Sequence, residues 1–539
     1  MNNRRKFIKQ MVLLFGASAM GNWACQRNNK YAHIKGKILT GNNKRGHLLR
    51  EGKFTKPTQT HYFDVVIVGS GIASLTAARK LQQNKITNFT ILELDDTIGG
   101  NAINGKNEVS AYPWAAHYLP IPNLDDKELL TFLQEHQIIT KIDDKGIPHY
   151  NEEYVCAEPE ERLFINGYWQ DGLIPNIGIS GEERKEIDAF FALIKSYKAA
   201  IGNDGKPAFT IPNFYSTTEN TYTDLDNISF YDFLKQKGFK TKALFWYLNY
   251  CVSDDYGTNL KDASAWSGIH YFAARKGVSG NTEGDTVLTW PEGNSFLAQK
   301  LASTLQTHIQ KNKLVYEIIP NQQQVVVNYH CFETKTAKQI IAKKVIVCAP
   351  QFVNKRIVKN YPEIKNFPFT YSPWMVANLT VNAYTEGTEG QPMSWDNVIY
   401  GSNSLGYVNA SHQLLQTQKP QQVFTFYLPL NTKTPKEARE EAYEKTYEQW
   451  LDIIFEELKQ AHPSLVNHIT NIDIKIWGHS MIRPTVGLRK HLKNPIFNEG
   501  INQNIFFAHS DLSGISIFEE AFFQGNKAAS QVIKTLANA

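Results

Sequence analysis

The sequence predicts an α/β fold built on a parallel β-sheet, and three observations indicate it. His61 to Val68 ends in the β-branched run Val65-Val66-Ile67-Val68, which is typical of a strand buried on both faces. Ile72 to Gln82 carries apolar residues at helical spacing, and Thr90 to Leu94 is again short and apolar. Strand, helix and strand in this order form one βαβ unit, from which parallel sheets are built.

Length and composition bound the class of protein. The 539 residues exceed what one simple core usually holds, and 42% hydrophobic with 20% charged residues is ordinary for a globular protein. No segment combines basic clusters with interleaved aromatic residues, so we expect no nucleic-acid partner. The five cysteines show neither CxxC nor paired histidine spacing. We therefore expect no metal site and no disulfide framework.

The first residues have the character of a targeting segment. Asn3-Arg4-Arg5-Lys6-Phe7-Ile8-Lys9 precedes the short apolar run Met11 to Met20, a pattern that predicts a signal peptide over residues 1–25. The paired arginines resemble a twin-arginine signal, which would deliver a folded protein to the periplasm. Two interpretations of Cys25 stay open, a lipidated cysteine that anchors the protein to the membrane or an unmodified one. A plain amphipathic N-terminus is the alternative to export.

Residues 26–60 are predicted to be a basic tether. From Arg27 to Lys56 there are nine Lys or Arg residues and a single acid. A run of this kind is usually a solvated segment, and an anchor for anionic lipid or nucleic acid is the alternative.

Farther along, the chain alternates helical and extended segments. The predicted helices are Glu182–Lys198, Phe230–Asn249, Gly293–Gln310, Pro435–Gln460 and Glu519–Leu536. The predicted strands are Leu314–Ile318, Gln324–Tyr329, Ala342–Ala349, Trp374–Val381, Gln422–Leu428 and Asn504–Ala508. Ile201 to Asp226, rich in Pro, Gly and polar residues, is predicted to be a loop-rich insert.

The turn between the first strand and its helix predicts a dinucleotide site. In Gly69-Ser70-Gly71-Ile72-Ala73-Ser74, Gly69 permits the tight turn and Gly71 lets the backbone approach a pyrophosphate. The helix N-terminus then offers N–H groups and a partial positive charge to the phosphates. Ser74 departs slightly from the Gly or Ala usual at the third position. Glu93 ends the second strand, where a carboxylate accepts hydrogen bonds from ribose hydroxyls and disfavours a 2′-phosphate.

A double glycine after this unit narrows the choice of cofactor. With Gly99-Gly100 the segment resembles the amine oxidase superfamily of flavoproteins, which includes monoamine and polyamine oxidases, phytoene desaturases and protoporphyrinogen oxidase. In that family the double glycine follows the ribose-binding acid and wraps the flavin side of the cofactor, so the resemblance implies FAD. The family often has arginine next, and Asn101 stands there in this chain.

Later segments carry the same resemblance. They are Trp290-Pro291-Glu292-Gly293-Asn294, Leu314 to Ile318, Lys344 to Pro350 and Phe506 to Asp511, with Glu519-Glu520-Ala521 to Gly525. The resemblance implies that Val315 meets the adenine and that Asp511 binds the ribityl–pyrophosphate region. It also implies that the helix after Asp511 points its N-terminus at the flavin, with Glu520 a further cofactor-binding candidate.

This resemblance implies a Rossmann-type FAD-binding domain that is discontinuous in sequence, with an α+β substrate domain. After residues 1–25 and 26–60, the FAD-binding parts are 61–125, 285–355 and 471–539, and the substrate-domain parts are 126–284 and 356–470.

The resemblance also bears on the electron acceptor. In such enzymes the flavin accepts a hydride or its equivalent, while the protein positions the substrate and tunes the ring. The family often carries a lysine on a substrate-domain strand. The corresponding strand here, Pro373 to Leu379, has none, which leaves oxygen or a carrier open as the acceptor.

Two regions supply candidates for chemistry near the flavin. His117, in Tyr112 to Tyr118, and Trp477, before Gly478-His479, are candidate catalytic groups, and structural packing is the alternative for His117. The substrate candidates are Asp255, Tyr256, Trp266 and His270. Aromatic faces with carboxylates suit an ammonium ion, and a helix-packing core is the alternative.

The sequence therefore predicts an exported FAD-dependent oxidoreductase that acts on a small molecule, oxidising the C–N bond of an amine or polyamine by hydride transfer to flavin. Two alternatives stay open. One is a dehydrogenase or isomerase of an apolar substrate, like the phytoene desaturase branch. The other is a non-catalytic flavin-binding surface protein.

Overall fold

The computed structural model describes residues 30–39, 41, 43–361, 367–384, 389–414 and 420–538. The chain divides into two units, Met1–Lys35 and Gly36–Ala539. Of the first unit only residues 30–35 are described, so the predicted signal peptide and Cys25 lie outside the described residues and stay predictions. Within the described ranges, no helix has both the length and the apolar character needed to cross a bilayer.

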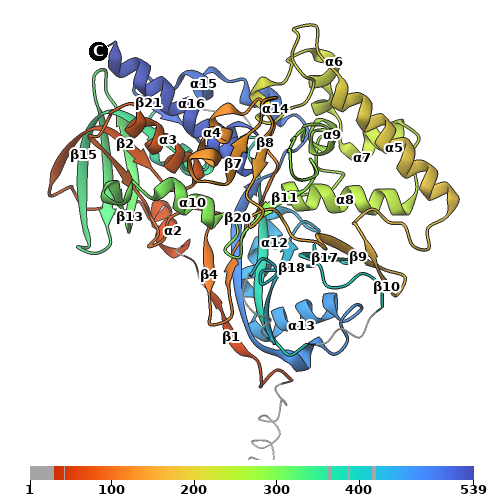
Figure 1. Cartoon of the computed structure of the whole chain (residues 1–539). Helices are drawn as coiled ribbons and strands as arrows, with labels where there is room; N and C mark the ends of the chain where they lie inside the picture. The colour runs from red at the N-terminus through yellow and green to blue at the C-terminus, as the bar shows by residue number, and fades with distance from the viewer. Residues whose placement is uncertain are drawn as a thin grey trace, which may run out of the picture. The chain divides into compact units, whose positions relative to one another are not determined.

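The predicted βαβ unit is present in a seven-stranded sheet of the second unit (Figure 1). β2 (Thr60–Val68), α3 (Ile72–Gln83) and β3 (Phe89–Leu92) follow in order, and β2 pairs with β3 in parallel. β15 (Thr336–Val347) runs parallel to β2 on its other side, and β21 (Ile505–Phe507) is parallel to the end of β15. The remaining strands of the sheet are β12 (Ile309–Gln310), β13 (Lys313–Pro320) and β14 (Val325–Cys331).

The first helix is held against the sheet by the last one. α16 (Phe518–Ala537) packs along α3, and Gly525 makes the crossing close, because a Cβ there would lie 2.3 Å from the Ala73 carbonyl oxygen. Apolar residues of both helices share one buried core with β2 and β3. Segments from opposite ends of the chain thus form one nucleotide-binding layer, as the predicted discontinuous domain requires.

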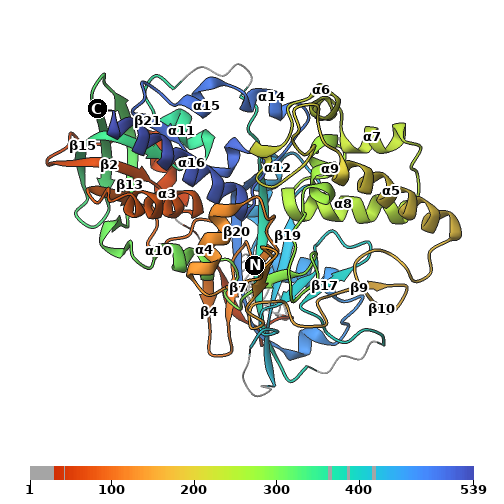
Figure 2. The same cartoon turned by 45° about the horizontal axis from the view of Figure 1, so that its top comes forward.

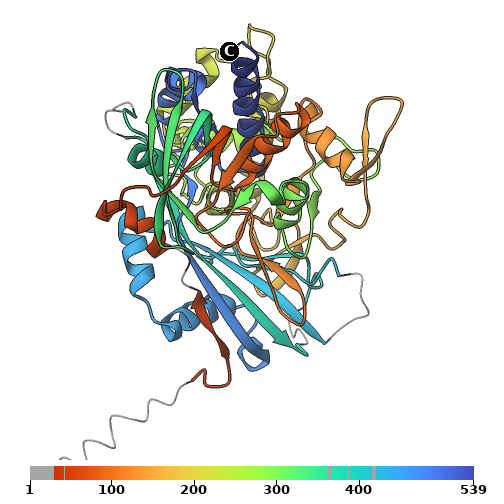
Figure 3. The ribbon, with the colours of Figure 1, turned by 90° about the vertical axis from the view of Figure 1, so that its left-hand side faces the viewer.

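An eight-stranded sheet forms the second layer. Its strand order is β1-β20-β16-β19-β18-β17-β9-β10. The long strands β20, β16 and β19 are antiparallel neighbours and form the teal-to-blue ribbon in the lower part of Figure 3. The strands are β1 (Lys35–Leu39), β9 (Glu161–Ile165), β10 (Tyr168–Asp171), β16 (Tyr371–Asn382), β17 (Asp396–Ile399), β18 (Tyr407–Asn409), β19 (Gln421–Pro429) and β20 (Ile469–Ile482).

A group of helices lies beside this sheet, away from α3 and α16 (Figure 2). The group consists of α5 (Gly181–Ala199), α6 (Asn220–Thr223), α7 (Phe230–Gln236), α8 (Lys242–Tyr256) and α9 (Ala265–Ala273). The prediction of one helix over Phe230–Asn249 was wrong. Gly238, at φ 87°, ends the first helix, and Thr241 begins a second.

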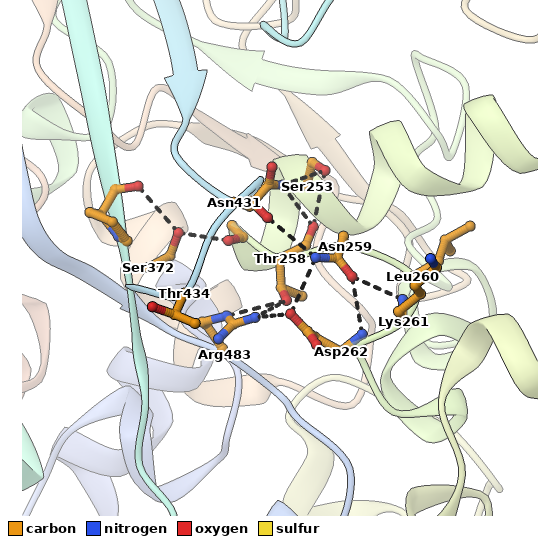
Figure 4. A network of polar contacts seen from close by, with 12 residues as sticks. Ser253, Thr258, Asn259, Leu260, Lys261, Asp262, Ser372, Asn431, Thr434 and Arg483 are labelled. Carbon is orange, nitrogen blue, oxygen red and sulfur yellow. Dashed lines mark hydrogen bonds and ion pairs between the residues drawn. The ribbon is translucent and has the colours of Figure 1, made fainter. Parts of the chain in front are cut away.

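The loop after α8 is fastened to the eight-stranded sheet by a polar network (Figure 4). Thr258 Oγ1 accepts hydrogen bonds from Arg483 Nε at 3.2 Å and Nη2 at 3.0 Å, and the same guanidinium pairs with Asp262. Asn431 Nδ2 donates to Ser253 Oγ at 2.9 Å. Ser372 Oγ on β16 donates to the Gly257 carbonyl oxygen at 2.6 Å. These contacts fix the C-terminal end of α8 relative to β16 and β20.

Part of the predicted basic tether is folded. Residues 36–39 belong to edge strand β1, and α2 (Asn43–Glu51) contacts β13 and Leu94, which follows β3. Arg45 Nη1 donates to Asn312 Oδ1 at 2.6 Å and its guanidinium lies 4.6 Å from the Phe332 ring centroid. The prediction of a solvated segment was wrong for α2, because the residues that Arg45 contacts, Asn312 and Phe332, lie far away in the sequence.

The predicted helix Pro435–Gln460 is two helices, because Lys445 leaves the helical conformation and Thr446 caps the second helix. Likewise, Gly293–Gln310 contains only a short helix. The other helices are α4 (Lys127–Glu135), α10 (Ser295–Ala302), α11 (Gln351–Ile357), α12 (Pro435–Glu444), α13 (Tyr447–Leu458), α14 (Leu488–Leu492) and α15 (Pro495–Glu499). The two-stranded sheets are β4 (Asn104–Lys106) with β5 (Ala111–Pro113), β6 (Tyr118–Pro120) with β11 (Val287–Thr289), and β7 (Ile139–Ile142) with β8 (Pro148–Tyr150).

Candidate active site

A large cavity is lined by residues of both layers. Its volume is about 1370 Å³, larger than the ~300–1,000 Å³ typical of small-molecule pockets. It extends from the glycine turn after β2 to the C-terminal end of α8, and strands β16 and β20 contribute to its wall. We describe it as a cofactor end, next to the glycine turn, and a substrate end, next to Asp254 and Asp255.

The cofactor end is built mainly from backbone. Gly71 and Gly99 form an isolated parallel bridge, and Gly99 N donates to the Ser70 carbonyl oxygen at 2.9 Å. Gly99 and Gly100 have φ values of 113° and 62°. A Cβ on Gly100 would lie 3.2 Å from Gly71 Cα. The double glycine and the glycine turn therefore lie against each other, with Ile72 and Ala73 of α3 lining the cavity beside them.

Glu93 lies where the sequence placed a ribose-binding acid. It lines the cavity and is buried. Its Oε2 accepts hydrogen bonds from Ser70 N at 2.7 Å and Ser70 Oγ at 2.6 Å, and its Oε1 accepts from Asp95 N at 2.8 Å. Burial raises the pKa of this carboxyl, and the hydrogen bonds from Asp95 and Ser70 oppose that shift. A carboxylate held this way presents its remaining lone pairs to hydroxyl donors.

Asp511 forms the corner opposite the glycine turn. Its Oδ2 accepts from Gln351 N at 2.8 Å and from Tyr371 Oη at 2.5 Å, and its Oδ1 lies 3.0 Å from His509 Nδ1. It lines the cavity, as does Val315 on β13. Both predicted residues are thus brought to the same cavity as Glu93.

The N-terminus of α16 faces the cavity, but through a different glutamate from the one predicted. Ile517, Phe518 and Glu519 line the cavity and Glu520 does not. Glu520 Oε1 instead accepts from Asn213 N at 2.6 Å. Burial raises the pKa of each of the two glutamates to about 7. On a helix, neighbouring residues face about 100° apart, so only one of the pair reaches the cavity.

These residues fit FAD. A Cβ at Gly100 would enter the space between the two glycine segments, and the α3 N-terminus offers N–H groups to a pyrophosphate. Glu93 would accept hydrogen bonds from a ribose, and Val315 and Asp511, for which the resemblance implied adenine and ribityl contacts, line the same cavity. Ser74 is buried and fills the third position of the turn, while Asn101 donates through Nδ2 to the Ser480 carbonyl oxygen.

The substrate end is made of charged and aromatic side chains. Arg275 Nη2 donates to Asp255 Oδ1 at 2.9 Å and Oδ2 at 2.7 Å. Tyr118 Oη lies 3.3 Å from Asp254 Oδ2 and 3.4 Å from Asp255 Oδ1. Burial and the neighbouring Asp255 raise the pKa of Asp254, whereas Arg275 opposes that shift. Asp255 is therefore neutralised by its partner, and Asp254 is the carboxyl left to face a ligand.

His117 is in the cavity wall, as predicted, within an aromatic group. Its ring stacks on Tyr427 with centroids 4.7 Å apart, and its Nδ1 lies 3.2 Å from the Ala115 carbonyl oxygen. Burial lowers the pKa of His117 to about 4, so the ring is neutral near pH 7. Trp374 and Val376 of β16 line the same part of the cavity.

Trp477 does not line the cavity. Its Nε1 donates to the Trp114 carbonyl oxygen at 2.7 Å, so its indole ties β20 to the segment before His117. Trp374, paired with Trp477 across the two strands and therefore on the same face of the sheet, lines the cavity instead.

Three of the four predicted substrate residues lie in a helical core rather than in the cavity. Tyr256 Oη donates to the Ser267 carbonyl oxygen at 3.0 Å, and His270 Nε2 lies 3.2 Å from the Thr210 carbonyl oxygen. Trp266 stacks on His270 and under the guanidinium of Arg489, 3.4 Å from the ring centroid. Of the four predicted substrate residues, only Asp255 lines the cavity. The alternative given for these residues, a helix-packing core, describes the other three.

A smaller acidic chamber of about 150 Å³ adjoins the substrate end and shares Tyr118, Asp254 and Arg275 with it. Its further walls include Glu160, Glu161, Asp285, Asp396, Tyr250, Tyr271 and Trp395. Burial raises the pKa of Glu160 to about 8 and that of Glu161 to about 7. Sequence reasoning missed Arg275 and Asp396, because no local motif marks them and only the fold gathers them. Glu519 lies in a segment that carries the resemblance, but Glu520 was the candidate there.

Comparisons with known proteins agree with this geometry. Residues 67–135 match the family model described as an NAD(P)-binding Rossmann-like domain. A double mutant of putrescine oxidase, redesigned for cofactor binding, has a TM-score of 0.66 and 15% identity over 88% of this chain and 100% of its own. The chain has the fold of that oxidase.

Two further solved structures have the same fold. Cyclohexylamine oxidase from Brevibacterium oxydans has a TM-score of 0.61 and 12% identity, over 88% of this chain and 99% of its own. A CLA-producing fatty acid isomerase from P. acnes has a TM-score of 0.56 and 15% identity, over 87% of this chain and 98% of its own. The fold is therefore shared by proteins that act on quite different substrates. The substrate class of this chain must be inferred from the residues at the substrate end of the cavity.

Proposed function

We propose that this chain is an FAD-dependent oxidoreductase that oxidises the C–N bond of an amine. The observation that carries the proposal is the substrate end of the cavity, where the half-buried carboxyl of Asp254 lies beside Tyr118 and the aromatic residues His117, Tyr427 and Trp374 line the same cavity. Aromatic faces and a carboxylate together favour an organic ammonium ion. The adjoining acidic chamber strengthens this preference, because burial raises the pKa values of its carboxyls and a bound cation, unlike an anion, stabilises their ionised form.

The chain's own groups bind the amine and manage its proton. Bound FAD would take up the hydride equivalent from the carbon next to nitrogen, leaving a C=N bond. Asp254 pairs with the ammonium and, because its pKa is raised by burial, is suited to accept the proton that must leave before oxidation. Tyr118 orients that carboxyl, and the aromatic rings of His117 and Tyr427 exclude water from the reacting carbon.

The test is anaerobic mixing of the purified full-length flavoprotein with linear, cyclic and aromatic amines, while flavin absorbance is followed. We expect at least one amine class to bleach the flavin. Asp254→Asn should lower kcat/KM for that amine about 100-fold, the scale of a lost acid–base group, while flavin content stays unchanged.

Glu520→Gln is the matched control, because Glu520 is also a buried carboxyl with a pKa raised to about 7 but does not line the cavity. It should retain wild-type kcat/KM. The proposal fails if no amine reduces the flavin, or if Asp254→Asn and Glu520→Gln behave alike.

An isomerase or desaturase of an apolar substrate is the second candidate. The structural likeness to a fatty acid isomerase favours it, and so does the absence of lysine from the β16 segment that lines the cavity. A fatty acid carboxylate would meet Asp254 and the acidic chamber, however, and like charges there would oppose binding. The putrescine oxidase neighbour was solved bound to putrescine, a cationic ligand, which is the charge this cavity suits.

A further inference from the structure

Four basic side chains gather on one wall of the cavity, outside the glycine cradle. His47 and Arg50 come from α2, Arg439 from α12 and His479 from β20, and all four line the cavity. Arg439 Nη1 donates to the Gly478 carbonyl oxygen at 3.0 Å. The ring of His479 stacks on Phe352 with centroids 4.5 Å apart. We refer to these four residues as the basic cluster.

His479 of the basic cluster belongs to a segment that has contacts toward both the double glycine and Asp511. On one side Asn101, directly after the double glycine, donates to the carbonyl oxygen of Ser480, the residue next to His479. On the other side, the ring of His479 stacks on Phe352, and the N–H of the preceding residue, Gln351, donates to Asp511. Residues 478–480 of β20 therefore connect the glycine loop with the Asp511 corner.

The members of the basic cluster repel one another. Burial, together with Arg439, Arg50 and His47, lowers the pKa of His479 to about 4. Burial and Arg50 also lower the pKa of Arg439, although Tyr443 and Glu440 oppose this. In the part of the chain that the structure describes, no carboxylate forms an ion pair with Arg50 or Arg439. Like charges brought together around a cavity without a carboxylate partner are stabilised by a bound anion.

We propose that Arg50 and Arg439, with His47 and His479 beside them, complete a diphosphate site that holds the pyrophosphate of the cofactor. The glycine turn offers only N–H groups and the helix dipole, and Asn101 is neutral. Two guanidinium groups supply the charge and the donors that a pyrophosphate requires. α2 thus serves as a clamp over the cofactor from a segment outside the nucleotide-binding layer.

The proposal rests on FAD being the cofactor, and it is tested by binding rather than turnover. The full-length protein, freed of flavin, is titrated at low ionic strength with FAD, riboflavin, ADP and adenosine. We expect Arg50→Ala and Arg439→Ala each to weaken FAD and ADP binding about tenfold, in line with a charge-assisted hydrogen bond. Riboflavin and adenosine, which lack the diphosphate, should bind the variants and the wild type equally.

Lys44→Ala is the matched control, since Lys44 is an exposed cation on the same helix that does not line the cavity. It should leave all four affinities unchanged. Arg439→Lys, which keeps the charge, should recover part of the lost affinity and shows whether the wall is still folded. Unchanged FAD and ADP affinity in the Arg50→Ala, Arg439→Ala double variant would overturn the proposal. Wild-type protein that binds no flavin would instead overturn the proposed function.

Discussion

The two ends of the cavity are built in different ways. The cofactor end uses backbone, glycine and a few short-range hydrogen bonds, such as those between Glu93 and Ser70. The substrate end uses side chains from separated segments, among them Tyr118, Asp254, Arg275 and Tyr427. A site formed by backbone atoms tolerates few substitutions, because most of them would alter the path of the backbone. A site formed by side chains can bind a different ligand after a single substitution. This difference explains why one fold holds amine oxidases and a fatty acid isomerase.

The largest expected effect comes from Gly99→Ala at the cofactor end. Gly99 has a φ of 113°, and a Cβ there would lie 2.5 Å from the Ala102 carbonyl oxygen, so the turn from Gly99 to Ala102 must rearrange, which disturbs the bridge between Gly99 and Gly71. A backbone strain of about 3 kcal/mol corresponds to roughly a 100-fold loss of FAD affinity. Titration of the flavin-free protein with FAD measures it.

Gly146→Ala is the control for this change. Gly146 also has a positive φ, 77°, but a Cβ there would meet nothing within 4 Å. We expect wild-type FAD affinity from it. If Gly99→Ala also binds FAD as tightly as the wild type, the cofactor end does not depend on the contact between its two glycine segments.

A smaller effect on kcat/KM should distinguish Trp374, which lines the cavity, from Trp477, which does not. Trp374→Phe changes the cavity wall and should lower kcat/KM for the amine about tenfold, or ~1.4 kcal/mol. Trp477→Phe should leave kcat/KM unchanged and lower the free energy of unfolding by about 1 kcal/mol, because it loses the hydrogen bond to Trp114. Steady-state kinetics and denaturant unfolding measure the pair. Equal kinetic losses in both variants would restore Trp477 as a catalytic candidate.

The smallest expected effect is on stability and concerns Glu520, which does not line the cavity. Its pKa is raised by burial to about 7 in the folded chain, against about 4.5 when unfolded. Between these values the unfolded chain has lost its proton and the folded chain has kept it, so stability falls as pH rises from about 4.5 to 7. Glu520→Gln removes this titration and should reduce the stability difference between pH 5 and pH 6 by about 1 kcal/mol. Urea unfolding at the two pH values checks this, and an identical pH dependence in variant and wild type would contradict it.

Much of the fold was predictable because its signals are local. β2, α3 and β3 lie within two residues of their predicted bounds, and α5 and α16 within two as well. The helices that were wrongly merged, α7 with α8 and α12 with α13, are broken by single residues whose conformation depends on packing. α2 was missed because its stability comes from contacts of Arg45 with Asn312 and Phe332.

The sequence by itself determined the cofactor end, because a glycine turn, a double glycine and Glu93 act through backbone geometry that a short segment specifies. Only the tertiary structure decided the substrate end. It brought Asp254 and Arg275 together with Tyr118 and Tyr427, and it turned Trp266, His270 and Glu520 into packing residues. Burial and side-chain direction made those choices, and both depend on neighbours from other segments, up to 307 positions away in the chain.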